Sequence, residues 1–463
     1  MNKLNKIIIT GIVATLLLVF PALNAHADTV ETLSFDLHGT VHQLGELIDG
    51  LVVEAPETGW NLEIIAPEMF AVTAYHTADV IWSEAVTSAP VDRQVISLQV
   101  LEDGRLFIEL AVNPTSPNPG ENSVGWAPVE NRGVLLALTY TLTLNDEFTF
   151  VQSDVVIRDE ESRFGHGSHV AMDYRYFVPN VEGNRPLIVW LHGIGDGTAT
   201  QSTEDGLVPL LGHRGAINLA SDESQAIFGG AYVLVPQSRN MWVFGTSPSM
   251  IVELVQEFAA THNVDTDRIY LAGASIGAVG ALRTVMYAPY MFAAVIPACV
   301  AFDNWTNAEL AAITTPTWIV NAITCHGHAA SNQRAADHIP NAIHTAFTEL
   351  RVPGVDRELN GHYAWLLFGN NLPQYNGLSL FEWTAGQTLL ENVVPTANVS
   401  QRPGNTNDLT ITVTEYLRGG HTRVVTETIE IRNNASGTYN VGDFRVFVNT
   451  QGNTQIREIR LVD

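Results

Sequence analysis

The spacing of hydrophobic and polar positions changes twice along the chain and divides it into three parts. In the first part, assigned to residues 28–155, apolar and polar residues alternate in short runs between turn-forming Gly, Pro, Asn and Asp; examples are TLSFDLHGTV, NLEIIA, RQVISLQVL, RLFIELAV and GVLLALTYTLTL. Alternation with period two and frequent turn signals predicts an antiparallel β-sandwich. We find no cluster of catalytic residue types here, so the sequence predicts a structural or adhesive role.

The second part, assigned to residues 156–392, has a different texture. Continuous apolar strands such as PLIVWLHG, AYVLVPQ, RIYLAG, FAAVIPACV and TPTWIVNAI alternate with helical runs such as SMIVELVQEFAATH, IGAVGALRTVMYA and QRAADHIPNAIHTAFTEL. Buried strands between amphipathic helices predict an α/β fold, a mostly parallel sheet with helices on both faces. In such sheets ligands bind at the carboxyl ends of the strands.

The third part, residues 393–463, begins with the Pro-, Asn- and Gly-rich segment VVPTANVSQRPGNTND, which predicts a linker. The runs LTITVTEYL, TRVVTETIEI, GDFRVFVNT and TQIREIRLV then alternate again, so a small all-β module is expected. A spacer role is predicted for it, with a binding or wall-contact role as the alternative.

The N-terminal segment reads as an export signal. In MNKLNKIIITGIVATLLLVFPALNAHA, two lysines precede a short apolar run and an Ala-His-Ala site, so residues 1–27 are predicted to be a signal peptide cut after Ala27. A retained membrane anchor is the alternative, but Pro21 and Asn24 interrupt the run. We expect a secreted protein with no membrane contact after cleavage.

Charge narrows the classes of partner. Both lysines of the chain, Lys3 and Lys6, lie in the leader, so 21 of the 23 basic residues remain, all arginine, against 49 acidic residues. The resulting net charge of −28 disfavours nucleic acids and anionic membranes as partners. The lack of lysine after the leader also excludes Schiff-base and Ser–Lys chemistry there.

Ser275 is the candidate nucleophile. It is the centre of a GxSxG sequence, LAGASIGAVG, between the predicted strand RIYLAG and the predicted helix IGAVGALRTV. A sharp turn from strand to helix strains the serine backbone and lifts its hydroxyl from the sheet edge, and flanking glycines avoid collisions. A purely structural tight turn is the alternative, and this context disfavours it.

An oxyanion needs N–H donors near the nucleophile. The segment LIVWLHGIGDGT places an HGxG turn after an apolar strand, so the backbone amides of Ile194 and Ile276 are the candidate donors. His192 in this turn is expected to shape the loop. The base should be a late histidine, and His362 in ELNGHYAW follows the order Ser, acid, His. Competing histidines are found at positions 326, 328, 338 and 344, of which the last two fall in a helical pattern.

Together these motifs resemble a family of secreted α/β-hydrolase esterases with an immunoglobulin-like (Ig-like) N-terminal domain, near the polyhydroxybutyrate-depolymerase, feruloyl-esterase and prolyl-oligopeptidase-like branches. The resemblance covers Ser162 to about Gln387 and is carried by YRYFVP, PLIVWLHGIGDG, DTDRIYLAGASIGAVGA, VIPACVAFD and GHYAWLLFGN. It implies an Ig-like fold for residues 28–155, an α/β-hydrolase fold for residues 156–392, an acyl-serine mechanism at Ser275 and a base at His362.

The chain departs from this family at the acidic member of the triad. Family members carry an Asp just after the strand equivalent to TPTWIVNAI, whereas this chain has Cys325 there and no carboxylate between Glu309 and Asp337. Three hypotheses follow. Asp303 orients His362 from the end of the preceding strand, Asp337 reaches in from its helix, or no carboxylate serves and the activity is weakened.

Cys299 and Cys325 are the two cysteines, and each closes one of two consecutive predicted strands. Because an exported chain with one cysteine pair rarely leaves both thiols free, a disulfide between them is hypothesised. The alternative is metal binding by Cys325 with His326, His328 and His338, whose spacing fits no regular zinc pattern. We therefore expect no metal.

The resulting prediction is a secreted serine esterase that needs no cofactor and acts on a small-molecule or polymer-linked ester. A prolyl-oligopeptidase-like peptidase is one alternative, although no paired acidic motif for a substrate amino end is present. The other is a binding protein on a degenerate hydrolase scaffold, suggested by the missing acid. The sequence leaves the oligomeric state open.

Overall fold

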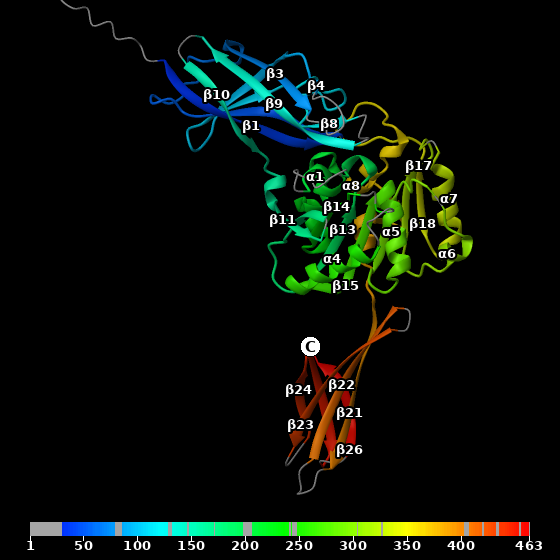
Figure 1. The fold of residues 1–463 in the computed structure, drawn as a ribbon. Coiled ribbons are helices and arrows are strands. Elements are labelled where there is room, and N and C mark those ends of the chain that lie inside the picture. The colour runs from blue at the N-terminus through cyan, green and yellow to red at the C-terminus, as the bar shows by residue number, and fades with distance from the viewer. Residues whose placement is uncertain are drawn as a thin grey trace, which may run out of the picture.

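A computed structural model of the chain describes residues 30–78, 86–127, 132–145, 148–170, 172–197, 206–239, 242, 248–302, 304–325, 327–401, 407–418, 421–431, 435–452 and 455–462. The predicted leader 1–27, Asp303 and His326 lie outside these residues. Figure 1 shows three successive bodies: a β-rich N-terminal part, an α/β part, and a β module at the C-terminus.

The N-terminal part is built from two five-stranded sheets. One has the order β10-β1-β2-β7-β6, and the other has the order β4-β3-β9-β8 with β5 paired to β3. The strands are β1 (Glu31–His42), β2 (Gly45–Val53), β3 (Phe70–Ala78), β4 (Val86–Thr87), β5 (Val91–Arg93), β6 (Val95–Val100), β7 (Leu106–Leu110), β8 (Val124–Ala127), β9 (Arg132–Leu144) and β10 (Phe148–Ile157). Alternate side chains of β1, such as Phe35 and Leu37, pack against Val72 and Leu142 of the second sheet, which makes the region a β-sandwich.

One predicted strand of this part is wrong. NLEIIA, residues 61–66, forms a turn ahead of the short helix η1 (Pro67–Met69). The Asn61 side chain accepts a hydrogen bond from the Glu63 N–H, and the Asn61 carbonyl accepts one from the Ile64 N–H. Asn competes in this way with strand pairing, so the local turn overrides the apolar alternation.

The middle part confirms the predicted mostly parallel sheet. Its order is β11-β12-β14-β13-β15-β16-β17-β18, and every neighbouring pair from β14 onward is parallel. The strands are β11 (Phe164–His169), β12 (Met172–Phe177), β13 (Arg185–Leu191), β14 (Tyr232–Gln237), β15 (Val264–Ala274), β16 (Ala294–Ala298), β17 (Trp318–Ala322) and β18 (Ile343–Phe347). The order reverses around β13, so the carboxyl ends of β13, β15, β16 and β17 meet at one edge, where ligands bind in such sheets.

Helices cover both faces of this sheet. They are α1 (Val208–Leu211), α2 (Arg214–Ile217), α3 (Asp222–Phe228), α4 (Pro248–Thr261), α5 (Ile276–Tyr287), α6 (Asn307–Ala311), α7 (Ala329–His338), α8 (Trp365–Gly369) and α9 (Leu380–Ala385), with short helices η2 (Glu161–Arg163), η3 (Ile194–Asp196), η4 (Asn218–Ala220) and η5 (Gly361–Tyr363) and the small hairpin β19 (Gln374–Tyr375) and β20 (Leu378–Ser379). In β13, Ile188 and Trp190 face the core with α2, α3, α8 and α9, while Val189 and Leu191 face the core with α4 and α5. Burial on both faces explains the unbroken apolar run of this strand.

The run QRAADHIPNAIHTAFTEL is only partly helical. Helix α7 ends at His338, and the segment after Pro340 forms the edge strand β18, so the prediction that His344 lies in a helix is wrong. Proline cannot continue a helix, and the β-branched Ile343 and Thr345 favour a strand.

The C-terminal module consists of two three-stranded sheets. They contain β21 (Leu390–Gln401), β22 (Asn407–Leu417) and β23 (His421–Ile431), and β24 (Gly437–Val441), β25 (Phe444–Gln451) and β26 (Gln455–Val462). The predicted all-β character is confirmed, but the predicted linker is wrong in its first half, because it forms β21. Pro395 is tolerated there because β21 is at the edge of its sheet.

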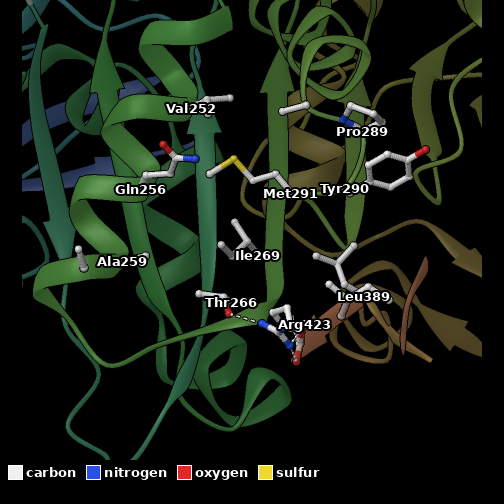
Figure 2. Close-up of a pocket in the computed structure, with 14 residues that line it drawn as sticks. Val252, Gln256, Ala259, Thr266, Ile269, Pro289, Tyr290, Met291, Leu389 and Arg423 are labelled. Carbon is white, nitrogen blue, oxygen red and sulfur yellow. Dashed lines mark hydrogen bonds and ion pairs between the residues drawn. The ribbon is translucent and has the colours of Figure 1, made fainter. Parts of the chain in front are cut away.

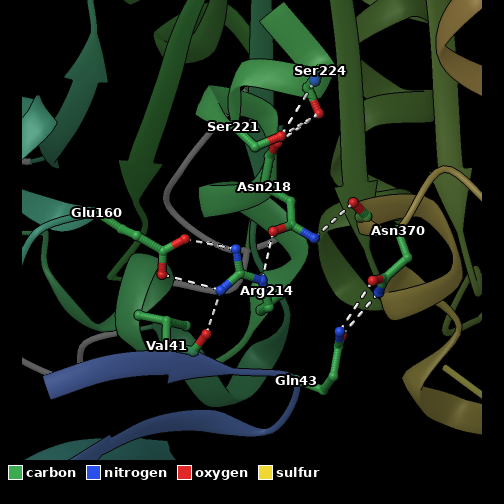
Figure 3. A network of polar contacts seen from close by, with 9 residues as sticks. Val41, Gln43, Glu160, Arg214, Asn218, Ser221, Ser224 and Asn370 are labelled. Atoms are coloured by element: carbon green, nitrogen blue, oxygen red, sulfur yellow. Dashed lines mark hydrogen bonds and ion pairs between the residues drawn. The ribbon is translucent and has the colours of Figure 1, made fainter. Parts of the chain in front are cut away.

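The N-terminal sandwich is joined to the α/β part by a polar network around Arg214, at the start of α2 (Figure 3). The guanidinium donates to both carboxylate oxygens of Glu160, at 2.7 and 3.0 Å, and to the carbonyl of Val41 at the end of β1. The amides of Gln43 and Asn370 exchange two hydrogen bonds of 3.0 and 2.8 Å. These contacts link the hairpin between β1 and β2 to α2 and α8.

The C-terminal module is anchored through Arg423 of β23. Its guanidinium donates to both oxygens of Asp267, at 2.6 and 2.7 Å, and to the hydroxyl of Thr266, at 2.9 Å. A cavity of about 610 Å³ lies beside this contact. It is lined by Val252, Met291 and other largely apolar side chains (Figure 2). Ser275 and His362 do not line it. Among the described residues, no helix is both long and apolar enough to cross a lipid bilayer.

Candidate active site

Ser275 lies at the turn between β15 and α5, at the carboxyl edge of the sheet. Its backbone adopts φ 55° and ψ −112°, a conformation that costs free energy for a residue with a side chain. Its N–H donates to the Ala298 carbonyl of the neighbouring strand at 2.9 Å, and its carbonyl accepts from the N–H of Ala278 in the first turn of α5 at 3.1 Å. The surrounding strand and helix therefore hold the turn that GxSxG predicts.

The two glycines of the motif are required by close packing. A Cβ added to Gly273 would lie 2.4 Å from the Gly277 carbonyl oxygen, and a Cβ on Gly277 would lie 2.0 Å from the Leu191 carbonyl oxygen. Both contacts involve backbone atoms, which cannot rotate away. The first turn of α5 thus rests directly on the end of β13.

The His362 side chain contacts the Ser275 hydroxyl. Its Nε2 lies 3.0 Å from the Oγ of Ser275, within hydrogen-bond distance. The imidazole is carried by η5, whose start is fixed by the Asn360 side chain, which accepts a hydrogen bond from the His362 N–H at 2.9 Å. The Trp365 ring packs edge-on against the imidazole at 5.4 Å between ring centroids.

The predicted oxyanion donors lie at two helix starts near Ser275. Ile194 is the first residue of η3 and Ile276 is the first residue of α5, so neither N–H has a partner within its own helix. Gly193 brings the two segments together, since a Cβ placed on it would lie 3.8 Å from the Ser275 Cβ. Two helix starts beside one hydroxyl can stabilise negative charge that develops there.

Sulfur atoms surround the other ring nitrogen of His362. The Sγ atoms of Cys299 and Cys325 each lie 3.3 Å from Nδ1, and both side chains are buried. Cys299 directly follows β16, and Cys325 follows β17. Both cysteines are free, so the hypothesised disulfide is not formed in this structure. Both sulfurs instead contact the same imidazole nitrogen.

The candidate acids do not occupy this position among the described residues. Asp337 is exposed on α7, where its Oδ1 accepts a hydrogen bond from Gln333 at 2.8 Å. The hypothesis that Asp337 orients His362 is therefore wrong. Asp303 lies outside the described residues, and that hypothesis stays a prediction.

His192 occupies the loop-shaping place predicted for it. Its Nε2 accepts from the Ser238 N–H at 2.9 Å, so Nδ1 carries the proton and donates to the Gly193 carbonyl at 2.6 Å. Complete burial lowers the pKa of His192, because the charged ring would be poorly solvated. A neutral imidazole thus holds the loop that carries Ile194.

Two of the competing histidines are engaged elsewhere, whereas the His328 ring lies 5.1 Å from the His362 ring. His338 Nδ1 lies 2.9 Å from the Arg334 carbonyl, and His344 Nε2 lies 2.6 Å from the Asn321 amide oxygen. Cys325, His326, His328 and His338 were the alternative metal ligands. Among the described residues, one group of three His, Cys, Asp or Glu side chains has its ligand atoms within 4.8 Å of one another, and of the four alternative ligands it contains only Cys325. That group consists of Cys299, Cys325 and His362, in which the His362 Nδ1 atom contacts both sulfurs.

The serine and histidine open into a cavity of about 380 Å³. Its walls come from two parts of the chain: Leu44, Val124, Gly125, Trp126 and Gly133 of the sandwich, and Gly193, Ile194, Gly195, Asp196, Gly212, His213, Ser275, Asn360, His362, Tyr363 and Trp365 of the α/β part. The Trp126 ring packs over Gly195, where an added Cβ would meet it at 3.0 Å.

This wall corrects the prediction of a merely structural or adhesive N-terminal part. The one signal in the sequence was Trp126 itself, and it is weak, because a single aromatic residue outside a core pattern is common. The contact of both cysteines with the imidazole was also missed, because their positions after consecutive strands indicated only that the two cysteines are neighbours.

Comparisons with known proteins bear on the family and the fold of this chain. Residues 173–315 match the protein family described as Esterase PHB depolymerase. A crystal structure of a thermostable esterase matches at 20% sequence identity with a TM-score of 0.59, over 77% of this chain and 99% of that chain. Est1E from Butyrivibrio proteoclasticus matches at 14% identity over 40% of this chain and 88% of that chain, with a TM-score of only 0.30. No curated protein matches the chain.

Proposed function

We propose that this chain, an esterase of the α/β-hydrolase type by its sequence match and fold, is a secreted serine hydrolase that cleaves carboxylic esters through an acyl-serine intermediate. The observation that carries the proposal is the 3.0 Å contact between Ser275 Oγ and His362 Nε2, at a strained turn beside two helix starts. Ser275, His362 and Ile194 line one cavity, and Ile276 directly follows the serine, so nucleophile, base and oxyanion donors lie together as acyl transfer requires.

The proposed reaction uses four proton transfers, two in forming the acyl-serine and two in hydrolysing it, all through His362. As Ser275 Oγ attacks the ester carbonyl carbon, His362 Nε2 takes the hydroxyl proton, and the N–H groups of Ile194 and Ile276 hold the oxyanion. His362 then gives that proton to the leaving alcohol, which departs and leaves the acyl-serine. Water then attacks the acyl carbon while His362 Nε2 takes a proton from it, and His362 returns this proton to Ser275 Oγ as the acyl–oxygen bond breaks and the carboxylic acid is released.

The cavity favours a substrate with an apolar or aromatic group. Its volume is within the range of small-molecule sites, and Trp126, Tyr363 and Trp365 contribute aromatic surface to its walls. Among charged groups on the wall, Asp196 pairs with His213 at 3.2 Å, so it is not free to bind a cationic substrate end. This favours an ester over a peptide with a free amino end.

Secretion and an Ig-like sandwich belong to the same proposal. The apolar leader of residues 1–27 supports export. The fold match to the thermostable esterase extends over more of the chain than residues 156–392 alone, which supports a shared flanking domain.

A fluorophosphonate probe and an ester substrate test the proposal on the mature full-length protein. We expect one covalent adduct at Ser275 and hydrolysis of p-nitrophenyl acetate. Ser275→Ala should abolish the adduct and lower kcat by about 10⁶-fold, by analogy with other serine hydrolases. A folded wild-type protein that forms no adduct and releases no p-nitrophenol would refute the enzyme and favour a binding protein on a hydrolase scaffold.

A further inference from the structure

We propose that Cys325, as a thiolate, replaces the carboxylate of the triad and orients His362 for catalysis, with the Cys299 thiol as its hydrogen-bond donor. The inference rests on the proposed esterase function. It makes Cys325 a positioning residue, because its sulfur acts on the substrate only through the imidazole.

The tautomer of His362 decides what its neighbour must be. For Nε2 to take the Ser275 proton it has to be unprotonated, so the ring proton of the neutral imidazole is on Nδ1. That N–H needs an acceptor, and the described atoms at hydrogen-bond distance from Nδ1 are the sulfurs of Cys299 and Cys325, both at 3.3 Å. A neutral thiol that donated to Nδ1 would force the proton onto Nε2 and block the base.

One proton shared by the two cysteines satisfies this requirement. The two Sγ atoms lie within 4.8 Å of one another. Hydrogen bonding from Cys299 lowers the pKa of Cys325, burial opposes this by raising it, and His362 and His328 lower it further. The hydrogen bond to Cys325 and burial raise the pKa of Cys299, so Cys299 keeps its proton and donates it. The result is a chain of contacts from Cys299 to Cys325, His362 and Ser275.

The position of Cys325 favours it over Cys299 as the anion. A buried anion needs nearby donors or positive charge. Cys325 has three titratable neighbours among the described residues: Cys299 from the end of β16, His362 from η5, and His328 from the turn before α7, whose ring lies 5.1 Å from the His362 ring. Cys299 shares the contact with His362 Nδ1 at 3.3 Å, so the neighbour that distinguishes Cys325 is His328.

The geometry is held by backbone packing. Gly361 lies against the segment that carries Cys325, with the site of its missing Cβ 2.6 Å from the Cys325 backbone nitrogen. The Cys325 carbonyl accepts hydrogen bonds from the N–H groups of His328 and Ala329, both at 3.1 Å. Two fixed loops therefore bring the sulfur to the imidazole.

The experiment compares Cys325→Ala, Cys325→Ser and Cys325→Asp with the wild type, all under reductant. Cys325→Ala and Cys325→Ser should lower kcat by about 10²- to 10⁴-fold with little change in KM, as expected when the orienting anion is lost. Cys325→Asp should restore at least about tenfold over Cys325→Ala. Its carboxylate oxygen is one bond further from the backbone than sulfur but takes a shorter hydrogen bond.

The pH profile of kcat/KM separates this role from a structural one. A thiolate stabilises the protonated imidazole, so Cys325→Ser should shift the acidic limb to lower pH while the plateau falls. Cys299→Ala removes the donor, so the pKa of Cys325 should rise and activity should recover only at higher pH. A cavity or a packing defect would lower the rate without moving the limb.

Absorbance of the thiolate gives a readout that does not need turnover. The ultraviolet difference between the wild type and Cys325→Ser should titrate well below the ordinary thiol pKa of about 8.5. Provided that Ser275 is labelled in the wild type, any of three results overturns the inference. The thiolate titration falls near the ordinary value, Cys325→Ala keeps the wild-type rate, or Asp303→Asn loses activity while Cys325→Ala does not. Failure of labelling in the wild type instead refutes the esterase function itself.

Discussion

Gly361 offers a direct test of how closely the two loops behind the imidazole must approach. A Cβ at this position would lie 2.4 Å from the Thr324 hydroxyl oxygen and 2.6 Å from the Cys325 backbone nitrogen. The hydroxyl can rotate away, but the backbone nitrogen cannot. Ordinary contact begins near 3.4 Å, so Gly361→Ala has to separate the loops by about 0.8 Å.

This separation acts on both sides of His362. The 3.0 Å contact with Ser275 and the 3.3 Å contact with Cys325 both depend on the position of the same ring. A displacement of about 1 Å at a reacting group costs about 10²-fold in rate. We therefore expect kcat/KM for p-nitrophenyl acetate to fall about 10²-fold, which is about 2.7 kcal/mol of transition-state stabilisation.

The matched control is Gly386→Ala. Gly386 has φ −78°, and its added Cβ would meet the Glu382 and Trp383 carbonyl oxygens at 3.5 Å, an ordinary contact. This variant should keep its activity within about twofold, since it moves nothing at the site. Circular dichroism and urea unfolding check that both variants are folded. A folded Gly361→Ala protein with wild-type kcat/KM would refute the reasoning.

Three further predictions concern stability and the cavity wall. Burial lowers the pKa of His192, so below about pH 6.5 the unfolded state binds more protons than the folded state. The free energy of unfolding should therefore fall as the pH drops, by up to about 1.4 kcal/mol per pH unit. His192→Gln should reduce that slope in urea titrations. Arg214→Met should lower the free energy of unfolding in urea by about 1–3 kcal/mol, whereas Arg163→Met, which breaks an exposed pair, should change it by less than about 0.5 kcal/mol; equal effects would contradict this. Trp126→Ala should lower kcat/KM for naphthyl acetate about tenfold relative to p-nitrophenyl acetate, and Trp60→Ala should not change the ratio.

The sequence predicted the parts of the site that depend on local structure. Ser275 was found because a strand, a tight turn and a helix are contiguous, and each leaves its own pattern. His362 was found from its place after the last strand of the sheet. The parallel sheet followed from strands that are apolar on both faces.

The parts that were missed depend on contacts between distant segments. No local pattern says that Cys299 and Cys325 turn toward one imidazole, because that depends on the register of two neighbouring strands. Nor does any pattern place Trp126 over Gly195, which depends on how the sandwich docks through Arg214. Local errors arose where one residue overrode a periodic run, as Asn61 and Pro340 did.

The wall that the sandwich contributes to the cavity has a consequence for how this protein can change. The residues that we propose to react with the ester all belong to the α/β part, while Val124, Trp126 and Gly133 of the neighbouring sheet line the same cavity. The proposed catalytic residues and part of the surface that contacts the substrate therefore lie in separate segments of the chain. Substitutions in the hairpin of β8 and β9 would change which ester fits without moving Ser275 or His362. Removal of the sandwich would leave these two residues in place but remove one wall of the cavity.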